Sequence, residues 1–121
     1  AKILLVEDND GFRRIYRDVL QHAGYAVLEA QNGESSLAMI KENNPDLILL
    51  DIMLPGIDGF EVLKSIRAED KTKHTPVIMF SVLGEEKGIM KSVELGANDY
   101  IIKGVDSPQE VLKKIKILLG R

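Results

Sequence analysis

The strongest constraint on the fold is a repeated unit in which a short apolar run precedes a segment with helical spacing. The apolar runs are continuous rather than alternating, as in parallel strands that are buried on both faces. Repeated strand–helix units joined by right-handed crossovers predict a doubly wound α/β sandwich with five parallel strands. The predicted strands are Ile3–Val6, Ala26–Ala30, Leu47–Leu50, Val77–Phe80 and Tyr100–Ile102.

Two of the intervening segments show clear helical periodicity, with apolar residues at i, i+3, i+4 and i+7. These residues are Phe12, Ile15, Tyr16, Val19 and Leu20 in the first segment, and Val111, Leu112, Ile115, Leu118 and Leu119 in the last. The sequences DGFE at 58–61 and SPQE at 107–110 fit capping boxes, the second with proline at the first helical position. Asn32-Gly33 predicts a turn, and Gly96 predicts a helix end.

Length and composition limit the class of protein. A chain of 121 residues is expected to form one domain over residues 1–121. The net charge of −3 gives no basis for direct nucleic-acid binding, and no apolar run is long enough for a membrane span. Cysteine is absent, which fits a reducing compartment, so we expect a cytoplasmic protein.

Candidate functional side chains follow four of the five predicted strands. Glu7 and Asp8 follow the first, Asp51 the third, Ser81 the fourth and Lys103 the fifth. Each of them alone could cap a helix or complete a turn, as we expect for the neighbouring Asn9 and Asp10. Ligands of open parallel sheets bind outside the carboxyl ends of the strands, so the five side chains are expected to form one pocket.

The chemistry of this set points to phosphoryl transfer. Carboxylates without softer ligands suit a hard divalent cation such as Mg²⁺, which also binds phosphoryl oxygens. One carboxylate can then act as a nucleophile and form an aspartyl phosphate. Asp51 is the candidate acceptor, because Ile52-Met53-Leu54-Pro55 follows it rather than a helix that it could cap. Ser81 and Lys103 would supply a hydrogen bond and a positive charge.

Four segments together resemble the receiver domains of two-component response regulators. They are VED at 6–8, LLDIMLPGIDGFE at 49–61, VIMFS at 77–81 and GANDYIIK at 96–103. The resemblance covers the whole chain and implies a (βα)5 flavodoxin-like fold with strand order 2-1-3-4-5. It also implies a phosphorylation-controlled signalling switch rather than an enzyme, apart from self-phosphorylation and self-dephosphorylation chemistry.

The resemblance assigns a role to each site residue. Asp51 would be the phosphoacceptor, Ser81 the switch hydroxyl, Lys103 the phosphate-binding lysine and Tyr100 the switch aromatic. Asp8, Asp51 and the backbone carbonyl of Met53 would bind Mg²⁺, with Glu7 acting through water. The donor would be a histidine kinase or phosphotransfer protein. The output surface would comprise residues 85–95 and 100–119, and it would act on an output domain or target protein that the sequence does not identify.

The chain departs from the family pattern in two places. Gly104 stands where proline usually follows the lysine, so we expect a trans peptide and an altered loop, because a cis bond before a residue other than proline costs about 2.5–4 kcal/mol. Val82 replaces the usual small residue after the switch hydroxyl. Apolar Met53 and Leu83 would flank the path of the attacking water, which predicts slow loss of phosphate.

Two other functions fit part of the sequence. Asp8-Asn9-Asp10-Gly11 resembles the motif of haloacid-dehalogenase-type phosphatases, in which Asp8 would be the nucleophile. That alternative gives Asp51 no role and lacks the acidic pair expected after the lysine. A pseudo-receiver that is never phosphorylated is the second alternative. The complete acidic set argues against it, whereas Gly104 and Val82 leave it open. A flavodoxin-like flavin site is disfavoured, because Glu7, Asp8 and Asp10 would repel the flavin phosphate.

Overall fold

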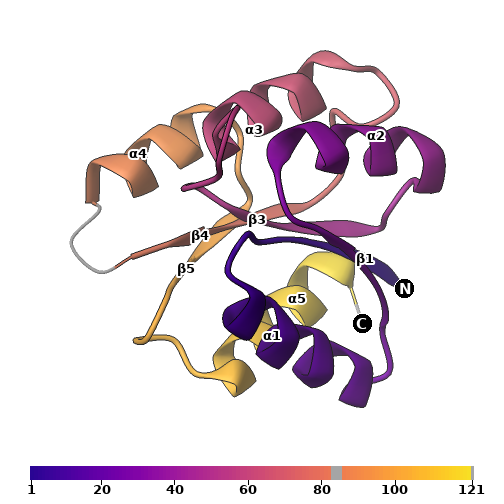
Figure 1. The fold of residues 1–121 in the computed structure, drawn as a ribbon, viewed down its shortest axis with the longest axis vertical. Coiled ribbons are helices and arrows are strands. Elements are labelled where there is room, and N and C mark those ends of the chain that lie inside the picture. The colour runs from indigo at the N-terminus through magenta and orange to yellow at the C-terminus, as the bar shows by residue number, and fades with distance from the viewer. Residues whose placement is uncertain (83–85, 121) are drawn as a thin grey trace.

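The computed structural model describes residues 1–82 and 86–120 and arranges them as five strands alternating with five helices (Figure 1). The strands are all parallel and lie in the order β2-β1-β3-β4-β5, as predicted. The elements are β1 (Lys2–Val6), α1 (Asp10–His22), β2 (Ala26–Ala30), α2 (Gly33–Asn43), β3 (Leu47–Asp51), α3 (Gly59–Ala68), β4 (Val77–Ser81), α4 (Glu86–Glu94), β5 (Asp99–Ile102) and α5 (Pro108–Leu119).

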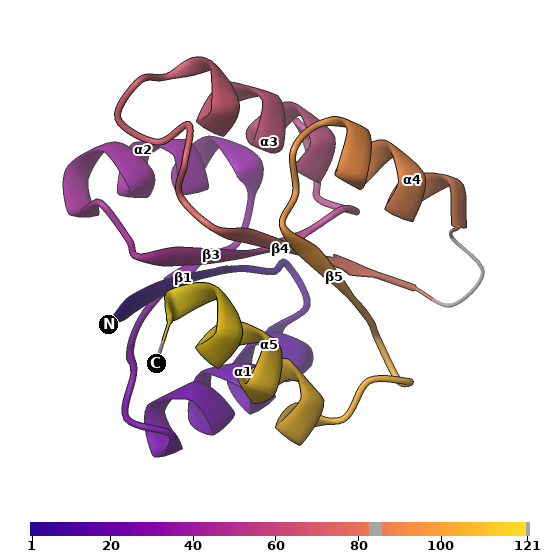
Figure 2. The same ribbon diagram turned by 180° about the vertical axis from the view of Figure 1, so that it is seen from behind.

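The helices cover both faces of the sheet, which explains why the strands are continuously apolar. Helices α1 and α5 lie on one face and α2, α3 and α4 on the other, as the views from both sides show (Figures 1 and 2). Successive residues of a strand therefore enter different cores. Leu4 and Val6 pack in the core under α2 and α3, whereas Ile3 and Leu5 pack in the core under α1 and α5. All four are fully buried.

Two strands are one residue longer at the carboxyl end than predicted, and this matters for the site. Asp51 ends β3 and aligns with Phe80, and Ser81 ends β4 and aligns with Ile102. Both polar residues therefore belong to the sheet itself rather than to the loops that follow it. Their backbones are fixed by the strand pairing, which holds the two side chains at one edge.

The helix boundaries follow the predicted caps closely. Asn9, Asp58 and Ser107 are N-caps whose side chains accept hydrogen bonds from backbone N–H groups of the first turn. Asn32 was expected in a turn, but it is the N-cap of α2 and accepts from the Ser35 N–H. The first residue of α2, Gly33, packs so closely against Ile57 that a Cβ there would collide with it. The absence of a side chain at Gly33 therefore permits this start of the helix.

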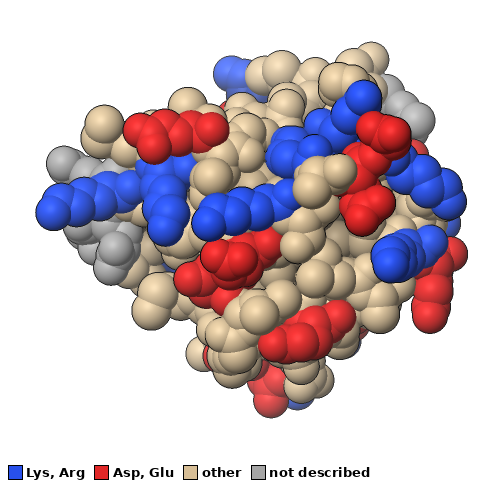
Figure 3. All heavy atoms as spheres, turned by 90° about the horizontal axis from the view of Figure 1, so that it is seen from above, with Lys and Arg blue, Asp and Glu red and all other residues tan. Residues whose placement is uncertain are grey.

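One apolar residue of the predicted α1 pattern does not join the core. Tyr16 and Leu20 are buried, but Ile15 is 58% exposed. The apolar spacing predicted the helix correctly, but it overestimated how many of the apolar side chains are buried. Within the described residues, none of the helices combines the length and the apolar character that crossing a bilayer requires. Over the face of α2, α3 and α4, basic and acidic side chains are interspersed (Figure 3).

Candidate functional site

Three carboxylates meet at the carboxyl end of the sheet. Glu7 directly follows β1 and Asp51 ends the adjacent β3, so neighbouring strands deliver them. Oxygens of Glu7, Asp8 and Asp51 all lie within 4.8 Å of one another. Glu7 is fully buried and Asp51 is 3% exposed, whereas Asp8 faces solvent. The cluster is therefore open on the side of Asp8.

Lys103 bridges the two buried carboxylates. Its Nζ donates hydrogen bonds to Glu7 Oε1 at 2.6 Å and to Asp51 Oδ2 at 2.9 Å. The residue follows β5, and its backbone N–H donates to the Ser81 carbonyl at 2.7 Å, which extends the β4–β5 pairing. The ammonium also lies 4.7 Å from the centre of the Phe12 ring, within cation–π range.

Backbone N–H groups hold the other oxygens of the same two carboxylates. The Met53 N–H donates to Asp51 Oδ1, and the Asn9 N–H donates to Glu7 Oε2, both at 3.1 Å. Helix α3 closes tightly behind Asp51, because a Cβ on Gly59 would collide with the Asp51 carbonyl oxygen. Only glycine fits there, so the packing of α3 fixes the end of β3.

Burial makes the protonation of Glu7 sensitive to its neighbours. Desolvation and the adjacent Asp51 raise the pKa of Glu7 from 4.5 to about 7, although the Lys103 ammonium opposes this rise. Burial alone would lower the pKa of Lys103, but the carboxylates of Glu7 and Asp51 outweigh it and raise that pKa. The lysine therefore stays charged at neutral pH, whereas Glu7 is only partly ionised.

The donor set fits a hard divalent cation. With all groups ionised, the three carboxylates and Lys103 leave an excess of negative charge that a divalent ion balances. The ligands are carboxylate oxygens without sulfur or imidazole, which suits Mg²⁺. The exposed Asp8 carboxylate provides the side from which such an ion and its waters can enter.

Ser81 has an unmet hydrogen-bonding capacity beside this cluster. Its Oγ is the one buried side-chain polar atom without a partner among residues 1–82 and 86–120. The residue is 3% exposed and ends β4, the strand next to β3. A buried hydroxyl in this state costs free energy, so it fits a position that receives an acceptor such as a phosphoryl oxygen.

The structure thus brings together four of the predicted residues, Glu7, Asp8, Asp51 and Lys103, by contact or proximity. Ser81 ends the adjacent strand. Tyr100 lies earlier on β5, where it is half-buried against the core under α2 and α3, and Lys114 Nζ lies 5.3 Å from its ring centre. The roles of these residues, including the Met53 carbonyl, remain predictions.

The two departures from the family pattern have different outcomes. No cis peptide occurs in the described part of the chain, and Gly104 adopts the left-handed conformation with φ of 80°, in agreement with the predicted trans bond. The loop is closed by Asp106, whose Oδ2 accepts from the Ile102 N–H at 2.7 Å. Val82 is 45% exposed. Leu83, predicted to flank the water path, lies outside the described residues.

Sequence reasoning missed three residues that support the site. Arg13 donates from Nη1 to the Glu7 carbonyl at 2.9 Å, Phe12 underlies Lys103, and Asp106 closes the loop after β5. Phe12 was assigned only to the apolar face of its helix. The i, i+3 spacing of Asp10 and Arg13 could have indicated their local ion pair, but nothing in the sequence indicates the contact with Glu7.

Comparisons with known proteins agree on one family. The model of the response regulator receiver domain matches residues 3–116. The transcriptional regulatory protein ResD of Bacillus subtilis is 46% identical over 121 residues, covering 100% of this chain and 49% of ResD. The phosphate regulon transcriptional regulatory protein PhoB of Pseudomonas aeruginosa is 40% identical, covering 98% of this chain and 52% of PhoB. The chain spans about half the length of the curated relatives it matches.

Solved structures give the same result. A provisionally assigned response regulator from Chloroflexus aurantiacus has a TM-score of 0.95 and 38% identity, with 99% of this chain and 98% of that chain covered. The chemotaxis response regulator CheY4 of Vibrio cholerae has a TM-score of 0.90 and 30% identity, with 98% of each chain covered. The likeness in fold therefore extends over nearly complete chains.

Proposed function

Since this chain belongs to the response regulator receiver domain family, we propose that Asp51 is the residue through which this phosphorylation-controlled switch accepts its phosphoryl group. One observation carries the proposal. Asp51 is a buried carboxylate that Lys103 and the Met53 N–H hold in place, with Glu7 and Asp8 within 4.8 Å. Glu7 has a matching pair of hydrogen bonds, but only Asp51 ends the strand that pairs with β4, the strand that ends in Ser81.

In the proposed reaction, an Asp51 carboxylate oxygen attacks the phosphorus of a phosphohistidine. A P–O bond forms while the P–N bond of the donor breaks, and the electron pair leaves with the imidazole, which then takes up a proton. The donor is a histidine kinase or a phosphotransfer protein. When bound, Mg²⁺ supplies charge neutralisation between the carboxylates and the incoming phosphoryl oxygens. Asp8, Asp51 and the Met53 carbonyl would hold the ion, and Glu7 would act through water.

Once Asp51 is modified, its neighbours gain new partners. Lys103 can pair with a phosphoryl oxygen, and the buried Ser81 hydroxyl can donate to another. Such differential contacts favour one of two conformations. We propose that Tyr100 follows Ser81 in this change, and that the output surface comprises α4, β5 and α5.

The output itself lies beyond this chain. ResD and PhoB are named transcriptional regulatory proteins, and the chain covers about half of each. We propose that this domain likewise controls an output domain or target protein. The comparisons give no support to a phosphatase that uses Asp8, and the solvent-facing position of Asp8 contrasts with the buried position of Asp51. They also give no support to a pseudo-receiver.

Intact mass spectrometry tests the assignment of Asp51. The protein is incubated with acetyl phosphate, with and without Mg²⁺, next to Asp51→Asn and Asp8→Asn. We expect a gain of one phosphoryl group in the wild type only when Mg²⁺ is present, and no gain in Asp51→Asn. Labelling of Asp51→Asn at the wild-type level would refute the proposal. Labelling on Asp8 would instead restore the phosphatase alternative.

A further inference from the structure

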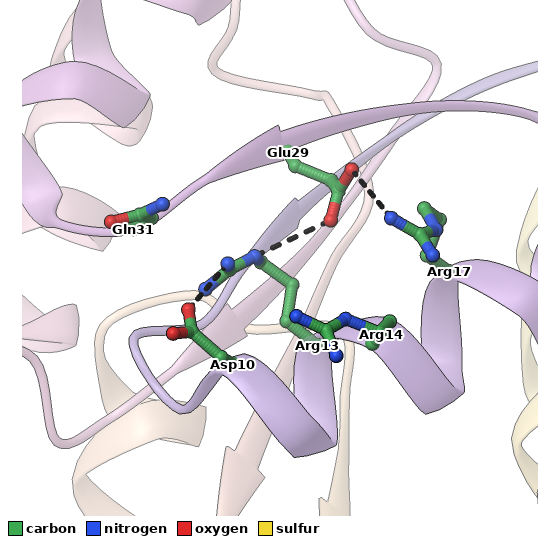
Figure 4. Close-up of a pocket in the computed structure, with 6 residues that line it drawn as sticks. All are labelled: Asp10, Arg13, Arg14, Arg17, Glu29 and Gln31. Atoms are coloured by element: carbon green, nitrogen blue, oxygen red, sulfur yellow. Dashed lines mark hydrogen bonds and ion pairs between the residues drawn. The ribbon is translucent and has the colours of Figure 1, made fainter.

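A second polar cluster lies between α1 and β2, beside the acid cluster. It surrounds a pocket of about 210 Å³ (Figure 4). Its lining residues are Asp10, Arg13, Arg14, Arg17, Glu29 and Gln31. Figure 4 shows Arg13 reaching from α1 between Asp10 and Glu29, with Arg17 approaching Glu29 from farther along the helix. Arg13 therefore connects this cluster to the functional site.

Each nitrogen of the Arg13 guanidinium has its own partner. Nε forms an ion pair with Glu29 Oε1 at 3.3 Å, and Nη2 donates to Asp10 Oδ1 at 2.6 Å. Nη1 donates to the backbone carbonyl of Glu7 at 2.9 Å. The Arg13 side chain is only 12% exposed, although its partner Asp10 is 69% exposed and Glu29 is 33% exposed. Its three partners belong to β2, to α1 and to the residue that follows β1.

The carbonyl that Arg13 holds belongs to the peptide group joining Glu7 to Asp8. The Glu7 carboxylate is also fixed by Lys103 and by the Asn9 N–H. The Asp8 carboxylate is exposed, and no hydrogen bond to it is found among the described residues. The direction of the Asp8 side chain therefore depends on the orientation of this peptide group.

An ordinary surface ion pair would be the simplest explanation of the Asp10–Arg13 contact, and such pairs contribute little. Two observations are not explained by a surface ion pair. The guanidinium is largely buried, and one of its acceptors is a backbone carbonyl of the site rather than an acid. A cation near the N-terminus of α1 also opposes the helix dipole, so helix stability does not account for Arg13.

We propose that Arg13 is a positioning residue for the metal site, which fixes the Glu7–Asp8 peptide so that both carboxylates face the same ion. The inference rests on the proposed function of the acid cluster. Arginine is required because its fork supplies three differently directed nitrogens, whereas lysine offers a single atom. Glu29 and Asp10 in turn hold the guanidinium in this orientation.

A Mg²⁺ titration of the folded protein tests the proposal. Amide shifts of residues 7–9 and 51–53 report the dissociation constant in the wild type, Arg13→Ala, Arg13→Lys and Arg14→Ala. Removing a supporting contact of a metal ligand commonly weakens binding by about tenfold or more, which we expect for both Arg13 variants. Arg14 lines the same pocket and is exposed, so Arg14→Ala controls for the lost charge. It should bind Mg²⁺ as well as the wild type or slightly more tightly.

Unfolding by urea in the presence of a chelator separates positioning from stability. A purely structural role would lower the unfolding midpoint of the Arg13 variants while leaving the dissociation constant of the folded protein unchanged, and that result overturns the proposal. Glu29→Gln provides a second variant if Arg13→Ala does not fold, with a smaller rise in the same direction expected. A wild type that does not bind Mg²⁺ refutes the proposed function as well, whereas equal binding by all variants refutes only the role of Arg13.

Discussion

The two sides of the site differ in how completely their polar groups are satisfied. On the side of β1 and β3, both buried carboxylates have hydrogen bonds from Lys103 and from backbone N–H groups. On the side of β4, the buried Ser81 hydroxyl has no hydrogen-bond partner within residues 1–82 and 86–120. The two buried carboxylates are thus held in place already, and in the proposed function the Ser81 hydroxyl gains its partner only when a phosphoryl oxygen arrives.

This difference gives the switch an energetic basis. A buried polar group without a partner costs about 1–3 kcal/mol. Supplying its acceptor can shift a two-state equilibrium by about 5- to 150-fold. The buried carboxylates of Glu7 and Asp51 gain less free energy from a new partner, since each already has two hydrogen bonds. We therefore expect the conformational signal to originate at Ser81 rather than at the acids.

The largest effect should come from the exposed acid on the side of β1 and β3. Asp8 is open to solvent, so Asp8→Ala should leave the fold intact. It should weaken Mg²⁺ binding by about 100-fold or more, because loss of a mere supporting contact already costs about 10- to 100-fold. Asp70→Ala removes a fully exposed carboxylate elsewhere and serves as the control. Calorimetric titration measures both. Equal affinities of Asp8→Ala and the wild type would remove Asp8 from the metal site.

A smaller effect concerns the stability of the metal-free protein. Because the folded-state pKa of Glu7 is raised to about 7, the folded protein retains a proton that the unfolded chain has already lost. Its free energy of unfolding should therefore fall as the pH rises from about 4.5 to 7, by on the order of 2 kcal/mol. Glu7→Gln should lack this decrease and gain stability relative to the wild type as the pH rises.

Urea unfolding at pH 5 and pH 7.5 with a chelator measures this difference. Glu42→Gln replaces an exposed carboxylate of α2 and should follow the wild type at both pH values. If the free energy of unfolding of Glu7→Gln changed with pH as that of the wild type does, Glu7 would not be protonated in the folded protein. The charge assigned to the acid cluster would then be wrong.

The smallest effect concerns the lifetime of the phosphorylated state. Met53 lies two residues beyond Asp51 and is 67% exposed, so its apolar side chain can exclude or misdirect water. Met53→Asn should speed phosphate loss several-fold, because asparagine can hydrogen-bond the attacking water. Met90→Asn on α4 is a matched control at 65% exposure and should change nothing. A rate for Met53→Asn equal to the wild type would leave shielding without support.

The sequence was sufficient to predict the fold and the acids. Continuous apolar runs indicated a covered parallel sheet, and carboxylates at strand ends indicated a common site, because strand geometry converts position along the chain into position in space. The Arg13–Glu7 contact could not be found in this way, since it depends on the rotamer of a helix side chain packed against a loop. The exposure of Ile15 and the cap at Asn32 likewise depend on how α1 and α2 sit against the sheet.

The unmet hydroxyl of Ser81 is also a property of the folded state. A serine after a buried strand commonly bonds to nearby backbone. Only the structure shows that Ser81 Oγ is buried and that the described part of the chain provides no such partner. Its position at the end of β4 was foreseen from the sequence, but its unsatisfied state was not.

The most direct test of this asymmetry compares amide spectra of the wild type and Ser81→Ala, first with Mg²⁺ and then with Mg²⁺ and beryllofluoride, a phosphoryl analogue. With Mg²⁺ alone, we predict shifts at residues 7–9 and 51–53 in both proteins. Adding beryllofluoride should shift residues 91–95 and 99–102 in the wild type, and these shifts should be much smaller in Ser81→Ala. Shifts of equal size at 91–95 in both proteins would contradict the claim that Ser81 starts the conformational change.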